Sequence, residues 1–328
     1  MLTEDVFGNG DFVYRADDSC VAVPADIEFG EAVGIAVDSR QRLFVFNRGG
    51  TEPVMVFDQE GNFEKMWGAG QFVRPHGIFI GPDDSVYLTD DQGHTVRKYT
   101  TDGQLLMTLG THGVPSNTGV ENSNYRTIQH PGPPFNLPTN LAVAPDGSLY
   151  VSDGYGNCCI HRFSPDGDLL HSWGSSGIEL GAFQIPHGIG VDQSGCVVVA
   201  DRENSRLQWF TPDGEFIEQW TDTARPCNVY FDEHDNLYVA EMGWHAGTPD
   251  PQPDETGGRV SIFRRDGSLL ARWGGGQNPY DAGDFIAPHD IWLDTQGNLY
   301  VSEVSISAGA ARGLVGADCP SLQKFVKQ

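Results

Sequence analysis

Residues 140–156 read NLAVAPDGSLYVSDGYG: a short apolar strand, a Pro-Asp-Gly turn, and a second strand rich in β-branched and aromatic residues. Asp and Gly suit this turn because tight turns need positive φ angles or side-chain caps. The pattern recurs along the chain with the turn in the same place. Its other copies lie at 34–50, 77–93, 188–204, 228–244 and 290–306.

A second hairpin follows most copies, as in IHRFSPDGDLLHSWG at 160–174. Four strands per copy, six copies and no helical periodicity predict an all-β fold, a six-bladed β-propeller of four-stranded blades. The last copy is one strand short. We expect the N-terminal strand DFVYRAD at 11–17 to fill that place and close the ring, which leaves no open sheet edge. Residues 1–328 are therefore predicted to form a single domain.

Three stretches interrupt the repeat and are rich in Gly, Pro, Ser or Asn. They span 111–138, 242–258 and 304–320. Long loops on a rigid scaffold commonly form or cover binding sites. The alternative is that they are surface decoration.

The net charge restricts the classes of partner that the chain could bind. The chain has 45 acidic and 20 basic side chains, a formal charge of −25, which argues against nucleic-acid and anionic-membrane binding.

No apolar run is long enough to cross a bilayer, and the first residues lack the pattern of a secretory signal. The six cysteines contain no CxxC pair, so we expect reduced thiols and no disulfide framework. These features predict a cytoplasmic protein, although a signal trimmed from the chain would escape this reasoning. Because a closed ring needs no partner, we expect a monomer.

The first strand of each propeller blade lines the central channel, so the residue at its entrance lies at the channel mouth. Histidine occupies this position in alternate copies, and five of the six positions follow a proline. Equivalent positions on alternate blades are related by a pseudo-threefold axis, so three imidazoles would point at one spot. Three protein nitrogens with one open position are typical of catalytic zinc, although imidazole also suits iron, copper or nickel. The alternative is duplication of an ancestral Pro-His repeat without a metal. The six positions are Val33, His76, Thr139, His187, Cys227 and His289.

The loop after the second strand of each blade opens at the same mouth, and there it carries Arg48, Tyr155 and Arg202. Arginine offers fixed, permanently charged donors suited to a carboxylate, and a tyrosine beside a cation can act as a general base. We expect an anion clamp and a proton acceptor. The alternative role is to tie blades together. The remaining seven histidines, including His161, are predicted to lie on the surface or in loops.

Four strings together resemble the peptidyl-α-hydroxyglycine α-amidating lyases, a family of six-bladed propellers related to NHL-repeat proteins. They are RPHGIFI, SDGYGN, IPHGIGV with VADRENSR, and APHDIWL. The resemblance implies a catalytic zinc held by His76, His187 and His289, with Tyr155, Arg48 and Arg202 as catalytic residues. It also implies a structural calcium bound by the backbone carbonyls of Ile35 and Ile78 and by Asp290, an oxygen-only site that suits a hard cation.

The sequence departs from this family at three points. Gly156 replaces a cysteine after the tyrosine, Cys196 faces Trp209 instead of a second cysteine, and Ala287 replaces a methionine of the substrate pocket. Ala287, Thr139 and Cys227 are expected to line that pocket. The departures leave the metal chemistry intact and put a peptide substrate in doubt.

The resemblance implies a zinc-dependent carbon–nitrogen lyase. It would cleave an α-hydroxyglycine-like carbinolamide, either small (N-acyl or ureido α-hydroxy acid) or at a peptide terminus, into an amide and glyoxylate or a related aldehyde. Two alternatives stay open. One is a metal-dependent hydrolase of an ester, lactone or amide that uses metal-bound hydroxide. The other is a non-catalytic NHL-type module whose mouth binds a protein loop.

Overall fold

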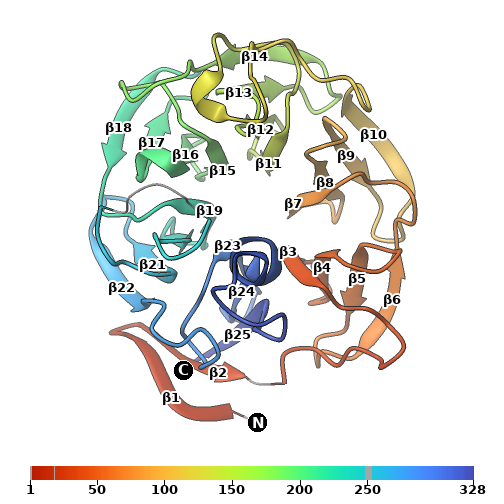
Figure 1. Cartoon of the computed structure of the whole chain (residues 1–328), viewed down its shortest axis with the longest axis vertical. Helices are drawn as coiled ribbons and strands as arrows, with labels where there is room; N and C mark the ends of the chain where they lie inside the picture. The colour runs from red at the N-terminus through yellow and green to blue at the C-terminus, as the bar shows by residue number, and fades with distance from the viewer. Residues whose placement is uncertain (1, 18, 248–252) are drawn as a thin grey trace. The chain divides into compact units, whose positions relative to one another are not determined.

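The computed structural model describes residues 2–17, 19–247 and 253–328. Its strands form six antiparallel sheets, one for each sequence repeat (Figure 1). The predicted fold class, an all-β six-bladed β-propeller, is confirmed. The predicted turns also form: Gly147 of the Pro-Asp-Gly turn has a φ of +84°.

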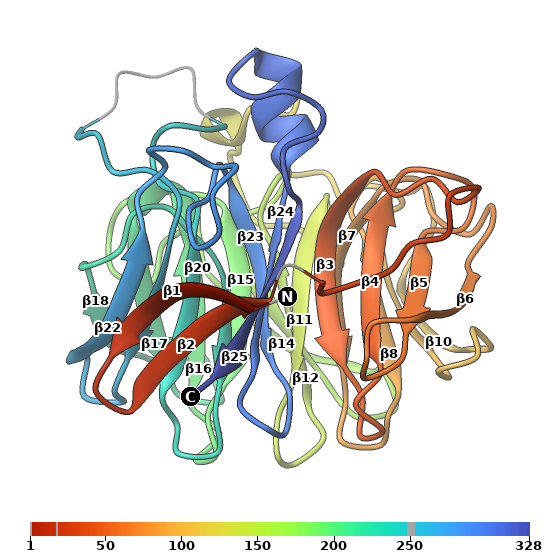
Figure 2. The ribbon, with the colours of Figure 1, turned by 90° about the horizontal axis from the view of Figure 1, so that it is seen from below.

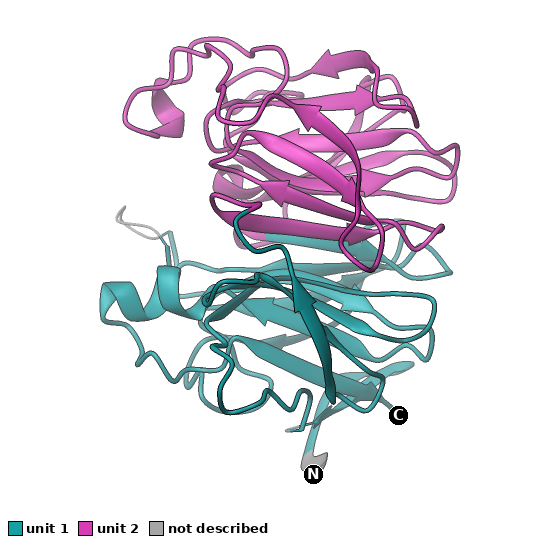
Figure 3. Cartoon of the chain, turned by 90° about the vertical axis from the view of Figure 1, so that its right-hand side faces the viewer, with its two compact units in different colours: residues 1–70, 227–328 teal, residues 71–226 magenta. Residues whose placement is uncertain are grey.

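The chain divides into two compact units, residues 1–70 with 227–328 (unit 1) and residues 71–226 (unit 2) (Figure 3). The assignment of residues 1–328 to one domain stays a prediction. Unit 2 contains three four-stranded sheets with their strands in chain order. Their strands are β7 Pro75–Ile80, β8 Val86–Asp90, β9 Thr95–Tyr99, β10 Leu105–Gly110, β11 Pro138–Val143, β12 Leu149–Asp153, β13 Cys159–Phe163, β14 Leu169–Trp173, β15 Pro186–Val191, β16 Val197–Asp201, β17 Arg206–Phe210 and β18 Phe216–Trp220. Two short 3-10 turns, η1 Tyr125–Thr127 and η2 Arg202–Asn204, complete this unit.

Unit 1 contains two four-stranded sheets and one five-stranded sheet of order β1-β2-β25-β24-β23. As predicted, the N-terminal strand β2 pairs antiparallel with β25 and completes the sixth sheet. The sequence did not predict β1, which adds a fifth strand outside β2 (Figure 2). The strands of unit 1 are β1 Leu2–Asn9, β2 Phe12–Asp17, β3 Glu31–Val37, β4 Leu43–Arg48, β5 Val54–Phe57, β6 Phe63–Trp67, β19 Pro226–Phe231 (its first residue belongs to unit 2), β20 Leu237–Glu241, β21 Arg259–Phe263, β22 Leu269–Gly274, β23 Pro288–Leu293, β24 Leu299–Glu303 and β25 Leu322–Lys327.

Burial falls from the inner strands to the outer ones. Every residue of β12 is buried, whereas the residues of the outer strand β14 are exposed or intermediate. In unit 2 the first strands lie next to one another, β7 against β11 and β11 against β15; in unit 1, β23 lies against β3. This arrangement explains why the inner strands read as continuous apolar runs, since both of their faces are covered by protein.

Three sequence expectations are wrong. The 304–320 stretch is partly helical, with a π-turn η3 (Ser305–Gly309) and a 3-10 turn η4 (Ala310–Arg312). His161 is fully buried in β13. Trp209 stands opposite Val198 in the strand register, not opposite Cys196.

All six cysteines lie in the described part of the chain, and none of them forms a disulfide, as the sequence predicted. Among the described residues, no helix is both long and apolar enough to cross a membrane. Residues 248–252 of the predicted 242–258 loop lie outside the described residues.

Candidate metal and catalytic site

A β-bulge sets the direction of the residue at the start of the first strand in the blades that begin with β3, β7, β11, β15 and β23. Where β15 pairs with β16, Pro186 stands opposite Asp201 and Gly188 opposite Ala200, so the strand register skips His187. The register slips at the same point for His76 in β7 and His289 in β23. A bulge re-aims a side chain and bends the strand, and bulges are common next to active sites. The preceding proline starts the strand, a position where its missing N–H costs no ladder bond.

The first strand of a neighbouring blade has a bulge at the corresponding position. The backbone carbonyl of that bulge residue holds the ring of a histidine in a defined orientation. His76 Nδ1 lies 2.6 Å from the carbonyl oxygen of Thr139, the bulge residue of β11. His289 Nδ1 lies 2.7 Å from the carbonyl oxygen of Val33, the bulge residue of β3. A carbonyl can only accept, so Nδ1 carries the proton and Nε2 keeps its lone pair in the neutral ring. Metal-binding histidines are oriented in this way.

In the three blades that carry a histidine at this position, a carboxylate at the end of the second strand anchors the segment that leads into the histidine. Asp90 accepts hydrogen bonds from the backbone N–H groups of Val73 and Arg74, at 3.0 and 2.9 Å. Asp201 accepts one from Gln184 at 2.7 Å, and Glu303 accepts two, from Ile286 and Ala287. Burial raises the pKa of Asp201 to about 6 and that of Glu303 to about 8.

Unit 2 brings Tyr155 between two of the predicted ligands. Its hydroxyl oxygen lies 3.1 Å from His76 Nε2 and 2.9 Å from His187 Nε2. These two histidines are buried, and their ligand nitrogens lie within 4.8 Å of one another. The ligand nitrogens of the two imidazoles therefore meet at the Tyr155 hydroxyl, and this donor set fits a metal with imidazole ligands.

Arg202 completes the unit 2 cluster. Its Nη1 donates to the Tyr155 hydroxyl at 3.3 Å, and its guanidinium lies over the Tyr155 ring, 5.3 Å from the centroid. Glu203 holds the Arg202 Nε at 2.9 Å and also binds Arg225 at 2.7 Å. Burial pushes the pKa of Glu203 upward, but the two guanidinium groups outweigh it and hold this pKa below its ordinary value. Arg202 is therefore held in place beside the phenol.

Arg74 was not among the predicted site residues. Its guanidinium lies over the Tyr155 ring, 5.7 Å from the centroid, and its Nε donates to the buried Asp91 at 2.8 Å. The signal was present, because Arg74 begins the RPHGIFI string two residues before His76.

In unit 1, Arg48 ends β4 and donates to Glu31 at 3.0 Å. The other Glu31 oxygen accepts the backbone N–H groups of Ile306 and Ser307, at 3.0 and 2.7 Å. Arg48 and the helical turn η3 therefore share one carboxylate. A catalytic role for Arg48 stays a prediction.

Asp290 is buried in β23, directly after His289. Its carboxylate accepts hydrogen bonds from the backbone N–H groups of Ile35 and Ile291, at 3.0 and 2.8 Å, and from Asn228 Nδ2. Burial raises the pKa of Asp290 to about 7. The side-chain oxygen of Asn228 is buried without a hydrogen-bond partner. A buried carboxylate beside an unpaired amide oxygen fits a hard cation. The sequence analysis did not single out Asn228, and calcium binding by Ile35, Ile78 and Asp290 stays a prediction.

The three predicted pocket residues are all fully buried. The Thr139 hydroxyl donates to the Pro186 carbonyl at 2.9 Å. Thr139 contacts the histidine cluster through its backbone carbonyl, which accepts from His76 Nδ1. Ala287 is held through its backbone by Glu303, and Cys227 begins the unit 1 part of β19. Their contact with a substrate stays a prediction.

A second group of potential metal ligands, Asp153, Cys159 and His161, is buried inside the third sheet. His161 Nε2 lies 3.4 Å from an Asp153 oxygen, and Nδ1 lies 2.8 Å from the Ser172 hydroxyl. Burial holds the pKa of the Cys159 thiol well above its ordinary value. His161 Nε2 also lies 3.4 Å from Cys159 Sγ, so the three side chains form one buried hydrogen-bond network within the blade.

Comparison with known proteins gives this geometry a context. The NHL repeat model matches residues 135–163 and 183–210. Human NHL repeat-containing protein 3 is 34% identical over 224 residues, 64% of this chain and 60% of that protein. Peptidyl-alpha-hydroxyglycine alpha-amidating lyase 1 of Drosophila melanogaster is 30% identical over 269 residues, 75% of this chain and 45% of that protein. The chain thus spans about three fifths or less of these relatives.

A solved structure of streptogramin B lyase superposes with a TM-score of 0.59 at 15% identity, covering 97% of this chain and 87% of that one. Similarity at this level shows the shared fold alone.

Proposed function

Because the chain is a divergent member of the NHL-repeat family of peptidyl-α-hydroxyglycine α-amidating lyases, we propose that it is a zinc-dependent carbon–nitrogen lyase. Its substrate is a carbinolamide with a carboxylate, N–CH(OH)–COO⁻, and its products are an amide and glyoxylate or a related aldehyde. One observation carries the proposal: the Tyr155 hydroxyl is shared by His76 and His187 and also bound by Arg202.

His76, His187 and His289 would hold the zinc through Nε2. Support comes from their common place in the bulge of a first strand. For His76 and His289 it also comes from the same Nδ1 contact with a bulge carbonyl. When bound, zinc supplies Lewis-acid polarisation of a substrate oxygen.

Tyr155 and Arg202 carry the proton and the carboxylate in this mechanism. Arg202 binds the substrate carboxylate, which places the adjacent hydroxyl at the Tyr155 oxygen. Tyr155 takes the hydroxyl proton of the substrate as it gives its own phenol proton to the departing nitrogen. The oxygen electrons form the aldehyde C=O bond, the C–N bond breaks, and the protonated nitrogen leaves as a neutral amide. No water is consumed, so the reaction is an elimination.

Arg48 would assist proton transfer, and a calcium ion at Ile35, Ile78 and Asp290 would stabilise the fold. Asn228 would add its amide oxygen to that calcium site, because the oxygen is buried without a partner.

The test combines elemental analysis with product detection. We expect one zinc per chain, and glyoxylate release from N-acyl-α-hydroxyglycines or from ureidoglycolate. His187→Ala should lose both zinc and activity, whereas His171→Ala, which removes an exposed histidine of the same unit, should keep both. Glyoxylate release no faster than with His187→Ala would contradict the lyase.

The same experiment separates the two alternatives. A binding module needs no stoichiometric transition metal. A hydrolase would place oxygen-18 from water into an acyl product, whereas an elimination would not.

A further inference from the structure

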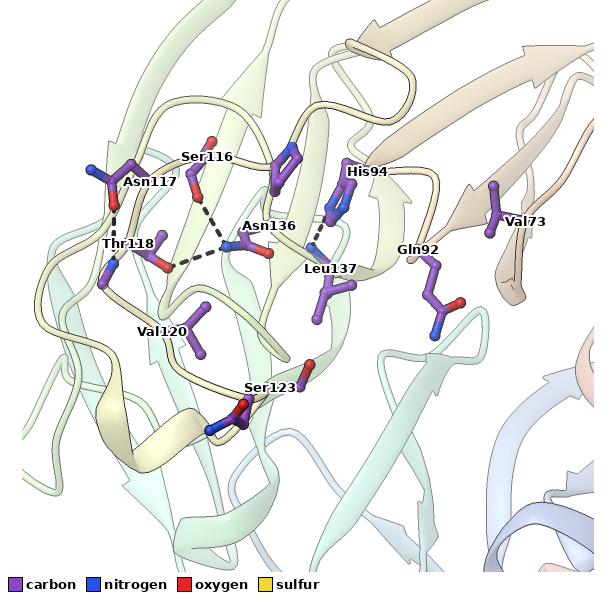
Figure 4. A pocket seen from close by; sticks show the side chains of 13 residues that line it. Val73, Gln92, His94, Ser116, Asn117, Thr118, Val120, Ser123, Asn136 and Leu137 are labelled. Atoms are coloured by element: carbon purple, nitrogen blue, oxygen red, sulfur yellow. Dashed lines mark hydrogen bonds between the residues drawn. The ribbon is translucent and has the colours of Figure 1, made fainter.

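The 111–138 segment, which connects β10 to β11 in unit 2, lines an open pocket of about 700 Å³ (Figure 4). One wall is the segment itself, from Pro115 to Ser123. The opposite wall comes from the entrance and loop of the second sheet, with Val73, Gln92 and His94. Asn136 and Leu137 lie between the two walls.

The chemistry of the pocket is polar and uncharged. None of its 13 lining residues is Asp, Glu, Lys or Arg, although the whole chain has a charge of −25. The one ionisable lining residue is His94, and burial lowers its pKa below the ordinary value, so the ring is neutral at pH 7.5. Amides and hydroxyls dominate the rest: Gln92, Ser116, Asn117, Thr118, Asn122, Ser123 and Asn136. Such a lining can donate and accept hydrogen bonds but cannot neutralise a charged ligand.

The walls are held in a defined and partly strained geometry. Asn136 Nδ2 donates to the Ser116 carbonyl at 2.9 Å, and the Leu137 N–H donates to His94 Nδ1 at 3.1 Å. His94 and Leu137 have φ angles of +54° and +62°, in the left-handed region that side chains rarely adopt. Strain of this kind clusters at functional sites, where the surrounding structure maintains it.

The pocket borders the turn that carries Tyr155 from two sides. The Tyr155 and Gly156 N–H groups donate to the carbonyls of Leu137 and Asn136, at 3.3 and 3.0 Å. On the other side, Val73 is the direct neighbour of Arg74, whose guanidinium lies over the Tyr155 ring. The pocket therefore adjoins the turn that carries Tyr155.

We propose that this pocket is a binding subsite for an uncharged amide-bearing group. This proposal rests on the proposed function: in the lyase reaction, the pocket receives the acyl side of the carbinolamide substrate. The lining offers no cation to a carboxylate, whereas its amides and hydroxyls can both donate to and accept from an amide, so the subsite favours an amide over an acidic group. The volume also favours an acyl arm larger than that of ureidoglycolate.

The test uses two probes of equal size, the N-methylamides of N-acetylglutamine and N-acetylglutamate, titrated at pH 7.5 by ligand-observed NMR. We expect the glutamine probe to bind at least tenfold more tightly than the glutamate probe. Gln92→Lys places a cation in the pocket and should reverse this preference. Because it is a gain of binding, misfolding cannot imitate it. Gln104→Lys makes the same charge change at an exposed position outside the pocket and should leave the preference unchanged.

Equal binding of both probes, no binding of either, or an unchanged preference in Gln92→Lys would overturn the subsite. Selective binding without any lyase activity would keep the subsite and remove the proposed function. Glyoxylate release that the glutamine probe does not inhibit would keep the lyase and remove the subsite.

Discussion

At the residue scale, the proposed lyase reaction depends on the single hydroxyl of Tyr155. Tyr155→Phe removes the proton acceptor and keeps the ring beneath Arg74 and Arg202, so zinc binding should persist. We expect kcat to fall by about 10²–10⁴-fold, the usual contribution of general acid–base catalysis. The measurement is glyoxylate release together with zinc content.

Tyr125→Phe, in the 111–138 segment of the same unit, is the matched control and should keep full activity. Loss of zinc together with activity in Tyr155→Phe would instead assign the tyrosine a structural role.

The buried carboxyl group of Glu303 should make the free energy of unfolding depend on pH. Burial raises its pKa to about 8 in the fold, against an ordinary value of 4.5 in the unfolded chain. Between these values the folded state keeps a proton that the unfolded state releases. The free energy of unfolding should therefore fall as pH rises through this window, by at most about 1.4 kcal/mol per pH unit for this group.

Urea unfolding at pH 5, 6, 7 and 8.5 measures this decline. Glu303→Gln should reduce the slope of the curve between pH 6 and 8.5 and most strongly above pH 7, below which Asp290 also contributes, whereas Glu60→Gln, at an exposed turn, should leave the slope unchanged. If Glu303→Gln has the wild-type slope, the group does not titrate in this range.

Repeat alignment found His76, His187, Tyr155 and Arg202 because each occupies a recurring place in the pattern. It could not find the bulges, since a bulge changes the register without changing the letters of the repeat. Arg74 was missed for a related reason: its role depends on the Tyr155 ring, which comes from a different blade. His161 was misassigned because its partners, Asp153 and Ser172, come from neighbouring strands.

At the element scale, β2 contributes more to the sixth sheet than β1 does. Tyr14 of β2 is fully buried, its ring centroid lies 5.6 Å from that of Trp273, and its hydroxyl lies 3.1 Å from that of Tyr238. Tyr14→Ala should lower the free energy of unfolding by about 3–5 kcal/mol, as for other large core truncations. Val6→Ala on β1, where Val6 is 52% exposed, should cost less than about 1 kcal/mol.

Denaturant midpoints of the two variants check this prediction, and equal costs would contradict it. The repeat pattern predicted β2 because the last copy lacked one strand. It could not predict β1, which completes no repeat and packs through Phe7 against Trp273 and Phe325. The helical turn η3 was missed for the same reason, since its first N–H groups are held by Glu31, far away in sequence.

At the scale of the whole molecule, the prediction of a single domain means that the chain should unfold as one cooperative unit. Unit 1 is built from both ends of the chain, joined by the pairing of β2 with β25 and the contact of β3 with β23, and unit 2 is the continuous segment between them. When unit 1 unfolds, both ends of unit 2 lose their anchors at once. We therefore expect one calorimetric transition, with an enthalpy of about 230 kcal/mol near 60 °C and a van't Hoff enthalpy equal to it. Two separable units would give a van't Hoff enthalpy near half the calorimetric value.

Tyr14→Ala tests the same prediction by a second route, because it destabilises unit 1 alone. In one cooperative domain the whole transition shifts to lower temperature, whereas in two independent units only the part from unit 1 shifts.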